Sequence, residues 1–237
     1  MIDYVELMGF GPRGWGLLMV QAALMTVAVS ATAFALGSLL GALIAWARIE
    51  GNRVLRFAAD AYATVLRGIP DLLVIYLLYF GGSAALTALA HALGAKGFVG
   101  VDAFAAGAIA VGIISGAYQS EIYRGAFQAI ARGELEAARS VGMPRTLLFR
   151  RIIVPQALRF AIPGLGNVWQ LALKESALIS VVGLTEILRQ AQVGAGSTRQ
   201  PFAFFITAAA LYLVLSTLSG WGFQRAEAVG MRGVRRS

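Results

Sequence analysis

Two opposite charges stand inside a long apolar stretch of the chain. Arg67 and Asp71 interrupt residues 57–80 and are four positions apart, which places them on one face of a helix that continued through Pro70. Charges inside an apolar segment of membrane length are costly, so they usually face a cavity or each other. One interpretation is a binding site for a zwitterion, with Arg67 toward a carboxylate and Asp71 toward an ammonium or basic side chain. The other is a structural ion pair that pins a kink at Gly68 and Pro70.

A second polar group lies late in another apolar segment, residues 155–179, which one proline and two glycines interrupt. Where a membrane helix is broken, the freed backbone groups and the polar side chains beside them can contact a substrate. Glu175 and Ser176 are therefore the preferred substrate ligands, and Lys174 is a further candidate.

A third pair of charges, Glu121 and Arg124, lies near the end of the apolar segment 103–123. Side chains three positions apart are neighbours on a helix and pair locally. We expect this pair to stabilise the structure rather than to bind a ligand.

The residue inventory argues against several kinds of chemistry. The chain has no cysteine and a single histidine, His91, so neither a thiolate metal site nor a histidine cluster is expected. It offers no Ser/His/Asp set and no convincing catalytic pair, so we expect no catalytic residue and no cofactor. The pattern G-x-x-x-x-G-K-[ST], which cradles phosphates, is also missing from the sequence. Any energy must therefore come from a partner or from a gradient.

The composition identifies lipid as the main solvent of this chain. Hydrophobic residues make up 58% of the 237 residues and charged residues only 14%, whereas soluble domains average about 25% charged residues. We therefore predict an all-α integral membrane protein in which residues 1–237 form a single transmembrane domain. Segments of about 20 apolar residues can cross a bilayer. The five predicted spans are residues 16–46, 57–80, 103–123, 155–179 and 202–224.

The basic residues predict the orientation of these spans. The rich set of connections carries Arg48, Arg53, Arg56, Arg132, Arg139, Arg145, Arg150, Arg151, Arg225, Arg232, Arg235 and Arg236, and the poor set carries Arg13, Lys96, Arg189 and Arg199. Connections rich in Lys and Arg stay in the cytoplasm. The N-terminus is therefore expected outside the cytoplasm and the C-terminus inside. This arrangement accounts for the net charge of +8 without a nucleic-acid partner.

Two small-residue patterns predict close helix packing. GSLLG at Gly37–Gly41 and GIISG at Gly112–Gly116 both place glycine at positions i and i+4. Such patterns allow two membrane helices to approach closely.

The longest cytoplasmic connection, residues 132–154, is the most basic part of the chain and contains most of the sequence EAARSVGMPRTLLFRRIIVPQA. Gly142 is expected to end one helix and Pro144 to begin the next, giving two short helices joined by a bend. Amphipathicity alone favours a helix on the membrane surface. A docking site for a soluble partner is the alternative.

This stretch resembles the EAA motif of ABC importer permease subunits, through Glu136, Ala137, Ala138, Gly142 and Pro155. In that family the motif forms the cytoplasmic coupling helix, which sits in a cleft of the ATPase subunit. The resemblance therefore implies that residues 132–154 couple this chain to an ATPase.

The resemblance extends over nearly the whole chain. The stretches RGIPDLLVIYLLYFGG (67–82), GAYQSEIYRGAF (116–127) and IPGLGNVWQLALKESALISVVGL (162–184) are similar to the polar amino acid permeases. Within these they are similar to the histidine/lysine/arginine/ornithine and octopine/nopaline importers, in the subunit type with Asp after RG-x-P. One departure is KESAL (174–178), where many relatives have KDTSL. Glu175 stands where those relatives have Asp, so the carboxyl group is retained on a longer side chain.

The resemblance implies a type I ABC importer transmembrane fold in a bacterial inner membrane, and transport of polar, basic amino acids by alternating access. It implies four kinds of partner: a second permease subunit, either a paralogue or the same chain, two ATPase subunits, a periplasmic amino-acid-binding protein and lipid. The chain itself would not be an enzyme. The charged residues alone would also suit a gradient-driven carrier or channel that needs no ATPase.

Overall fold

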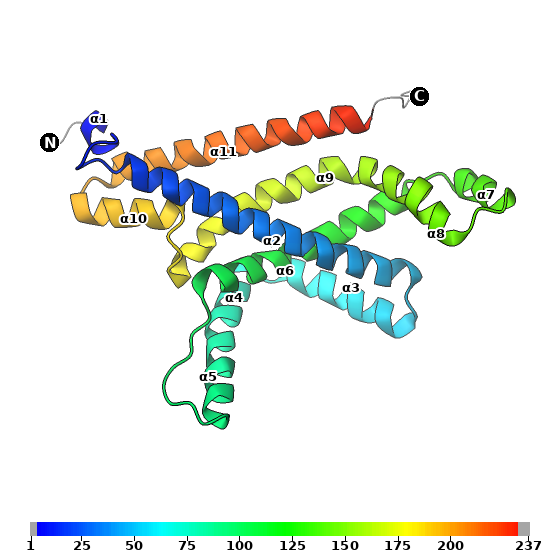
Figure 1. The fold of residues 1–237 in the computed structure, drawn as a ribbon, viewed down its shortest axis with the longest axis horizontal. Coiled ribbons are helices and arrows are strands. Elements are labelled where there is room, and N and C mark those ends of the chain that lie inside the picture. Colours follow the sequence, from blue (N-terminus) through cyan, green and yellow to red (C-terminus); the bar gives the residue numbers. More distant parts are fainter. Residues whose placement is uncertain (1–3, 232–237) are drawn as a thin grey trace.

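The computed structural model describes residues 4–231, and these residues form helices and connecting turns without a strand. Four long helices run along the length of the molecule (Figure 1). They are α2 Gly16–Glu50, α6 Ala103–Gln128, α9 Val154–Glu175 and α11 Pro201–Gly230. Helix α6 packs against α2 and α9, and α9 also packs against α11. One buried apolar cluster lies between α2, α6 and α9 and also includes residues of α4 and η3.

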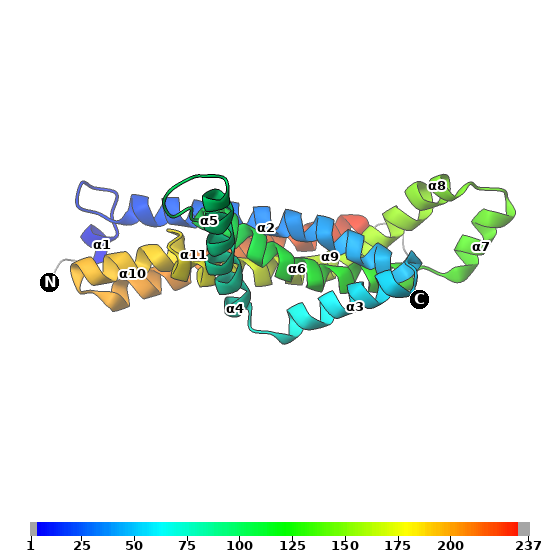
Figure 2. The ribbon, with the colours of Figure 1, turned by 90° about the horizontal axis from the view of Figure 1, so that it is seen from below.

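The remaining elements cap or flank the bundle. They are α1 Tyr4–Leu7, α3 Arg53–Gly68, α4 Asp71–Tyr76, the π-helix η1 Leu77–Gly81, α5 Gly82–Ala92, α7 Arg132–Ser140, α8 Arg145–Leu148, the π-helix η2 Phe149–Ile153, the 3-10 helix η3 Ser176–Val182 and α10 Ile187–Thr198. Helices α1 and α10 lie at one end of the bundle, whereas α7 and α8 lie beyond the other end (Figures 1 and 2). The end of α11 lies toward α7 and α8 (Figure 1).

The chain breaks near the predicted kink. Helix α3 ends at Gly68, Ile69 and Pro70 are extended, and α4 begins at Asp71. Residues 57–80 are therefore not one continuous helix. The segment α4–η1–α5 projects from the side of the bundle instead of continuing α3 (Figures 1 and 2). Proline explains the break because it lacks an N–H and disfavours helical backbone in the residue before it.

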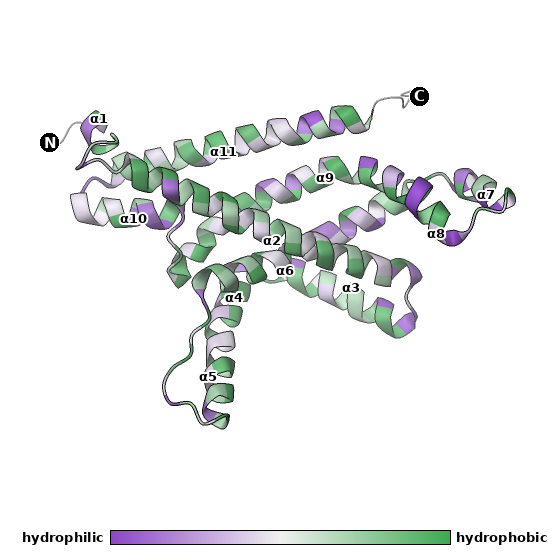
Figure 3. Cartoon of the chain, in the orientation of Figure 1, coloured by the Kyte–Doolittle hydropathy of each residue, from purple (hydrophilic) through white to green (hydrophobic). Residues whose placement is uncertain are grey.

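Four helical stretches are long and apolar enough to cross a membrane by length and composition: Gly16–Glu50, Asp71–Ala92, Ala103–Gln128 and Pro201–Gly230. Helix α9, which covers most of the expected span 155–179, is not among them. It carries polar residues throughout its length, among them Gln156, Arg159, Asn167 and Gln170. Apolar residues predominate along the long helices, whereas polar residues gather around α7 and α8 (Figure 3). The five-span arrangement remains a prediction.

The two small-residue patterns face each other where α2 crosses α6. A Cβ atom on Gly41 would lie 2.9 Å from the Cβ of Gln119 and 3.1 Å from the carbonyl oxygen of Gly116. Gln119 is fully buried in this contact. Its side-chain amide accepts a hydrogen bond from Ser38 at 2.7 Å and donates one to the Phe34 carbonyl at 3.1 Å. The close approach of the two helices therefore places the Gln119 amide of α6 within hydrogen-bonding distance of Ser38 and Phe34 on α2.

We expect Gly41→Leu to force α2 and α6 apart, because its side chain has no free volume at this contact. Overpacking of this kind costs about 1–3 kcal/mol, and thermal unfolding in detergent measures the loss. Gly222→Leu on α11 is the matched control, since a Cβ there meets open space. Equal melting temperatures for the two variants would show that the crossing is not closely packed.

Candidate functional site

The predicted bend in residues 132–154, here called the coupling segment, is present in the structure. Helix α7 ends before Gly142, which has a φ of +75°. The N–H of Gly142 donates to the Arg139 carbonyl at 3.0 Å, and the N–H of Met143 donates to the Ala138 carbonyl at 3.2 Å. These two bonds form a Schellman motif, which needs a left-handed residue at the position of Gly142. The chain then restarts as α8 after Pro144.

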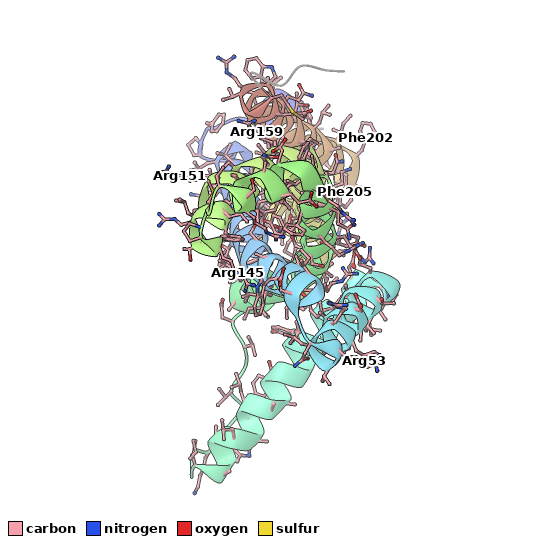
Figure 4. All side chains as sticks on the ribbon, turned by 90° about the vertical axis from the view of Figure 1, so that its right-hand side faces the viewer. Arg53, Arg145, Arg151, Arg159, Phe202 and Phe205 are labelled. Atoms are coloured by element: carbon pink, nitrogen blue, oxygen red, sulfur yellow. The ribbon has the colours of Figure 1, made fainter. Side chains whose placement is uncertain are left out.

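The coupling segment presents its motif residues at the end of the molecule. Glu136, Ala137, Gly142 and Pro155 are exposed, whereas Ala138 is buried. Two apolar side chains are also exposed there, Val141 at 77% and Phe149 at 52%. Arg145 and Arg151 lie in the same region when the molecule is viewed from this end (Figure 4). The segment is therefore an exposed surface of mixed apolar and basic character.

A side-chain contact closes the base of the coupling segment. The amide of Gln156, near the start of α9, donates to the carboxylate of Glu134 on α7. The contact joins the two ends of the segment across 22 residues of chain, so α7 and α9 are linked directly. The EAA resemblance did not single out either residue, because neither belongs to the motif.

The structure brings together two of the five predicted substrate ligands. Asp71 begins α4, which packs against α6 and η3, and Glu175 ends α9, directly before η3. The carboxyl groups of Asp71 and Glu175, here called the acidic pair, are neighbours, and the Tyr118 side chain of α6 lies near both. Glu175 is only 5% exposed, and its Oε1 atom has no hydrogen-bond partner among the described residues. A buried carboxylate oxygen without a partner is suited to accept a hydrogen bond from a cationic ligand.

Two of the other three candidates make contacts elsewhere, and the third is exposed. The buried hydroxyl of Ser176, the first residue of η3, donates to the Leu173 carbonyl of α9 at 2.7 Å. Lys174 is exposed. Arg67 donates through Nη2 to Glu121 Oε1 at 2.9 Å, and no ion pair between Arg67 and Asp71 occurs among residues 4–231.

The Glu121–Arg124 pair is present and belongs to a larger group. Arg124 Nη2 lies 2.8 Å from Glu121 Oε2. Arg48 and Arg67 also approach Glu121, each with an N–O distance of 2.9 Å, and Arg48 pairs with Asp60 at 2.6 Å. We call these five residues the Glu121 cluster. The sequence predicted only its local pair, because the other members come from α2 and α3.

A buried carboxylate outside the predicted set is Glu186, which caps the start of α10. It accepts hydrogen bonds from the N–H groups of Leu188 and Arg189 at 2.9 and 2.7 Å, and from the Tyr212 hydroxyl at 2.7 Å. Burial raises the pKa of Glu186 above its usual range, although these donors act in the opposite direction. Its contacts tie α10 to α11. An acid directly before a helix is the signal that would have indicated this cap.

Comparisons with known proteins identify the family of this chain. The family model described as "Binding-protein-dependent transport system inner membrane component" matches residues 37–227. The octopine transport system permease protein OccQ of Rhizobium radiobacter is 56% identical over 235 residues, which cover 99% of each chain. The histidine/lysine/arginine/ornithine transport system permease protein HisQ of Escherichia coli is 37% identical over 206 residues, covering 87% of this chain and 90% of that protein.

A solved structure shares the architecture as well. The crystal structure of an amino acid ABC transporter with histidines matches with a TM-score of 0.79 at 31% identity, covering 96% of this chain and 99% of the other. The all-helical fold is thus that of the type I ABC importer permeases. The chain belongs to the family of inner-membrane components of binding-protein-dependent transport systems.

Proposed function

We propose that this protein is the permease subunit of an ABC importer that carries basic amino acids or their opine derivatives across the bacterial inner membrane. The observation that carries the proposal is the coupling segment, which extends beyond the bundle and presents Glu136, Ala137 and Gly142 to solvent. The bend between α7 and α8 is exposed, and the left-handed conformation of Gly142 fixes its angle. A bend with a fixed angle can bind in a complementary cleft of an ATPase. Ala138 supports the bend from within, and Pro155 begins the return into α9.

The proposed assembly contains a second permease subunit, which is either a paralogue or a second copy, two ATPase subunits and a periplasmic amino-acid-binding protein. The coupling segment faces the cytoplasm, so α1 and α10 lie on the periplasmic side. Four positive side chains at the coupling end, Arg53, Arg145, Arg151 and Arg159, support this orientation (Figure 4). Arg232, Arg235 and Arg236 lie outside the described residues.

The acidic pair is the proposed subsite for the cationic part of the substrate. A guanidinium or ammonium group would donate to Glu175 Oε1 and to Asp71, and its positive charge would offset their mutual repulsion. Relatives of this chain are named for the transport of octopine, of nopaline, and of histidine, lysine, arginine and ornithine. Lys174 and Ser176 flank Glu175 in the chain and stay further candidate ligands, but Lys174 is exposed and the Ser176 hydroxyl donates to the Leu173 carbonyl.

The proposed mechanism is alternating access. ATP-driven closure of the partner ATPases would displace the coupling segment, and the helices attached to it would turn the substrate cavity from one side of the membrane to the other. Only α6 and α9 connect directly to the coupling segment, and α9 carries Glu175 at its far end. The alternative from the charged residues, a gradient-driven carrier, gains no support from the family or from its solved members.

A competition assay tests the substrate class. We expect unlabelled arginine and octopine to inhibit ATP-driven uptake of labelled arginine by the complete transporter, because both present a guanidinium to the acidic pair. Citrulline is the matched control, since it has a similar shape without the positive charge. Equal inhibition by citrulline and arginine would contradict a cation-selective subsite. A charge-assisted contact of this kind contributes about 1.5–3 kcal/mol, so the expected difference is roughly 10- to 100-fold.

A further inference from the structure

Glu121 joins three helices through one carboxylate. Its Oε1 atom lies 2.9 Å from Arg48 Nη1 of α2 and 2.9 Å from Arg67 Nη2 of α3, while its Oε2 atom accepts from Arg124 of its own helix. Asp60 on α3 binds the other side of Arg48 at 2.6 Å. The cluster therefore holds the ends of α2 and α3 against α6.

Arg67 lies at the end of α3, just before the break that leads to the acidic pair. Its Nε atom donates to the Ala63 carbonyl at 3.0 Å, so the guanidinium is fixed to α3 at one edge and to Glu121 at the other. Gly68, Ile69 and Pro70 follow, and Asp71 begins α4. The position of Asp71 relative to α6 thus depends on where Glu121 holds Arg67.

Helix α6 runs from this contact to within three residues of the coupling segment. Tyr118, one helical turn before Glu121, lies near the acidic pair. Helix α6 continues from Glu121 to Gln128, and α7 begins at Arg132. At 1.5 Å per residue the distance from Glu121 to the end of α6 is about 10 Å. A displacement of the coupling segment would therefore move Glu121 as well, because only about two turns of α6 separate them.

The charge balance makes the cluster sensitive to the loss of Glu121. Three arginines face two carboxylates, and the side chains of Arg48 and Glu121 are only 12% and 21% exposed. Without the Glu121 carboxylate, Arg67 and Arg124 would have no acidic partner in the cluster. Partly buried arginines that lose their partner repel each other and separate. The ends of α3 and α6 would then move independently.

We propose that Glu121 is a positioning residue that transmits displacement of the coupling segment, through Arg67, to Asp71 in the substrate subsite. The proposal rests on the proposed function, because it requires an ATPase at one end of α6 and a substrate at the other. It assigns Arg67 to this linkage rather than to the substrate carboxylate. Substrate binding and ATP binding are then coupled in both directions, as thermodynamic linkage requires.

The test is the ATPase activity of the complete reconstituted transporter carrying Glu121→Gln, measured with and without substrate-loaded binding protein. We expect basal hydrolysis to stay within about twofold of wild type, stimulation by the loaded binding protein to fall at least about tenfold, and the substrate concentration for half-maximal stimulation to stay unchanged. Asp60→Asn is the matched control, because Asp60 contacts Arg48 but neither Arg67 nor Arg124. It should keep stimulation within about twofold of wild type.

Two further variants keep the proposal falsifiable if Glu121→Gln does not assemble. Glu121→Asp, which keeps the charge, should restore most of the stimulation, whereas Arg67→Lys, which loses the two-pronged guanidinium, should reduce it. Normal stimulation in Glu121→Gln or in Arg67→Lys would overturn the linkage, and so would equal losses in Glu121→Gln and Asp60→Asn. Failure of the proposed function looks different, because the wild-type transporter itself would then show no stimulation.

Discussion

Replacing Gly142 with valine is expected to abolish ATP-driven uptake while leaving membrane insertion intact. Gly142 has a φ of +75°, a left-handed conformation that a β-branched residue adopts only with strain. The cost is about 1–2 kcal/mol for an L-residue. That cost is small beside the stability of the whole bundle, but it acts on two hydrogen bonds that set the angle between α7 and α8. The bend should therefore open, and the coupling segment should no longer fit its cleft.

Gly133→Val is the matched control for this change. Gly133 lies in the same helix as Glu136, has no positive φ, and would carry a Cβ in open space. Uptake and substrate-stimulated ATP hydrolysis, measured on equal amounts of inserted protein, should be lost in Gly142→Val and retained in Gly133→Val. Glu136→Lys should also lose coupling, because it reverses the charge of an exposed motif residue. Normal coupling in Gly142→Val and Glu136→Lys would refute the assignment of the coupling segment.

Changing Glu175 to glutamine is expected to remove the preference for cationic substrates. The variant keeps the size of the side chain but replaces the unpartnered carboxylate oxygen with a neutral amide. Loss of one charge-assisted hydrogen bond corresponds to about 1.5–3 kcal/mol, or roughly 10- to 100-fold weaker competition by arginine. Competition by citrulline should change much less. The measurement is the ratio of the two inhibition constants in the uptake assay.

Glu50→Gln serves as the control for this second change, since Glu50 is an exposed carboxylate at the end of α2. It should leave the arginine-to-citrulline ratio unaltered. If Glu175→Gln kept the wild-type ratio, the acidic pair would not be the cation subsite. Asp71→Asn should shift the ratio in the same direction as Glu175→Gln, because both carboxylates face the same ligand position.

Local features of the fold were predictable from the sequence. The bend at Gly142 and Pro144 follows from backbone preferences of residues only two positions apart. The Glu121–Arg124 contact follows from helical spacing. Each of these features depends on a few neighbouring residues, so the rest of the chain does not need to be known. For residues 132–154 this local reasoning left two alternatives open, a membrane-surface helix and a docking site. The EAA resemblance favours the docking site.

Features that depend on distant residues were not predictable. Arg67 and Asp71 would share a helix face only if the helix continued through Pro70, and the chain breaks there, at the predicted kink. The partner of Arg67, which the sequence did not indicate, is 54 residues away in the chain. The proximity of Asp71 and Glu175 depends on how α4 packs against η3. Periodicity within one segment carries no information about either contact. Spacing indicates which residues share a helix, whereas packing decides which helices meet.

The most direct test of this account is uptake into proteoliposomes that contain this chain with the proposed second permease and ATPase subunits, supplied with binding protein and labelled arginine. We predict uptake only when ATP is present on the side that the coupling segment faces and when the binding protein is present on the other side. A gradient of protons or sodium without ATP should drive none. Equal uptake by this chain alone under such a gradient, with no ATP and no partner, would contradict the account.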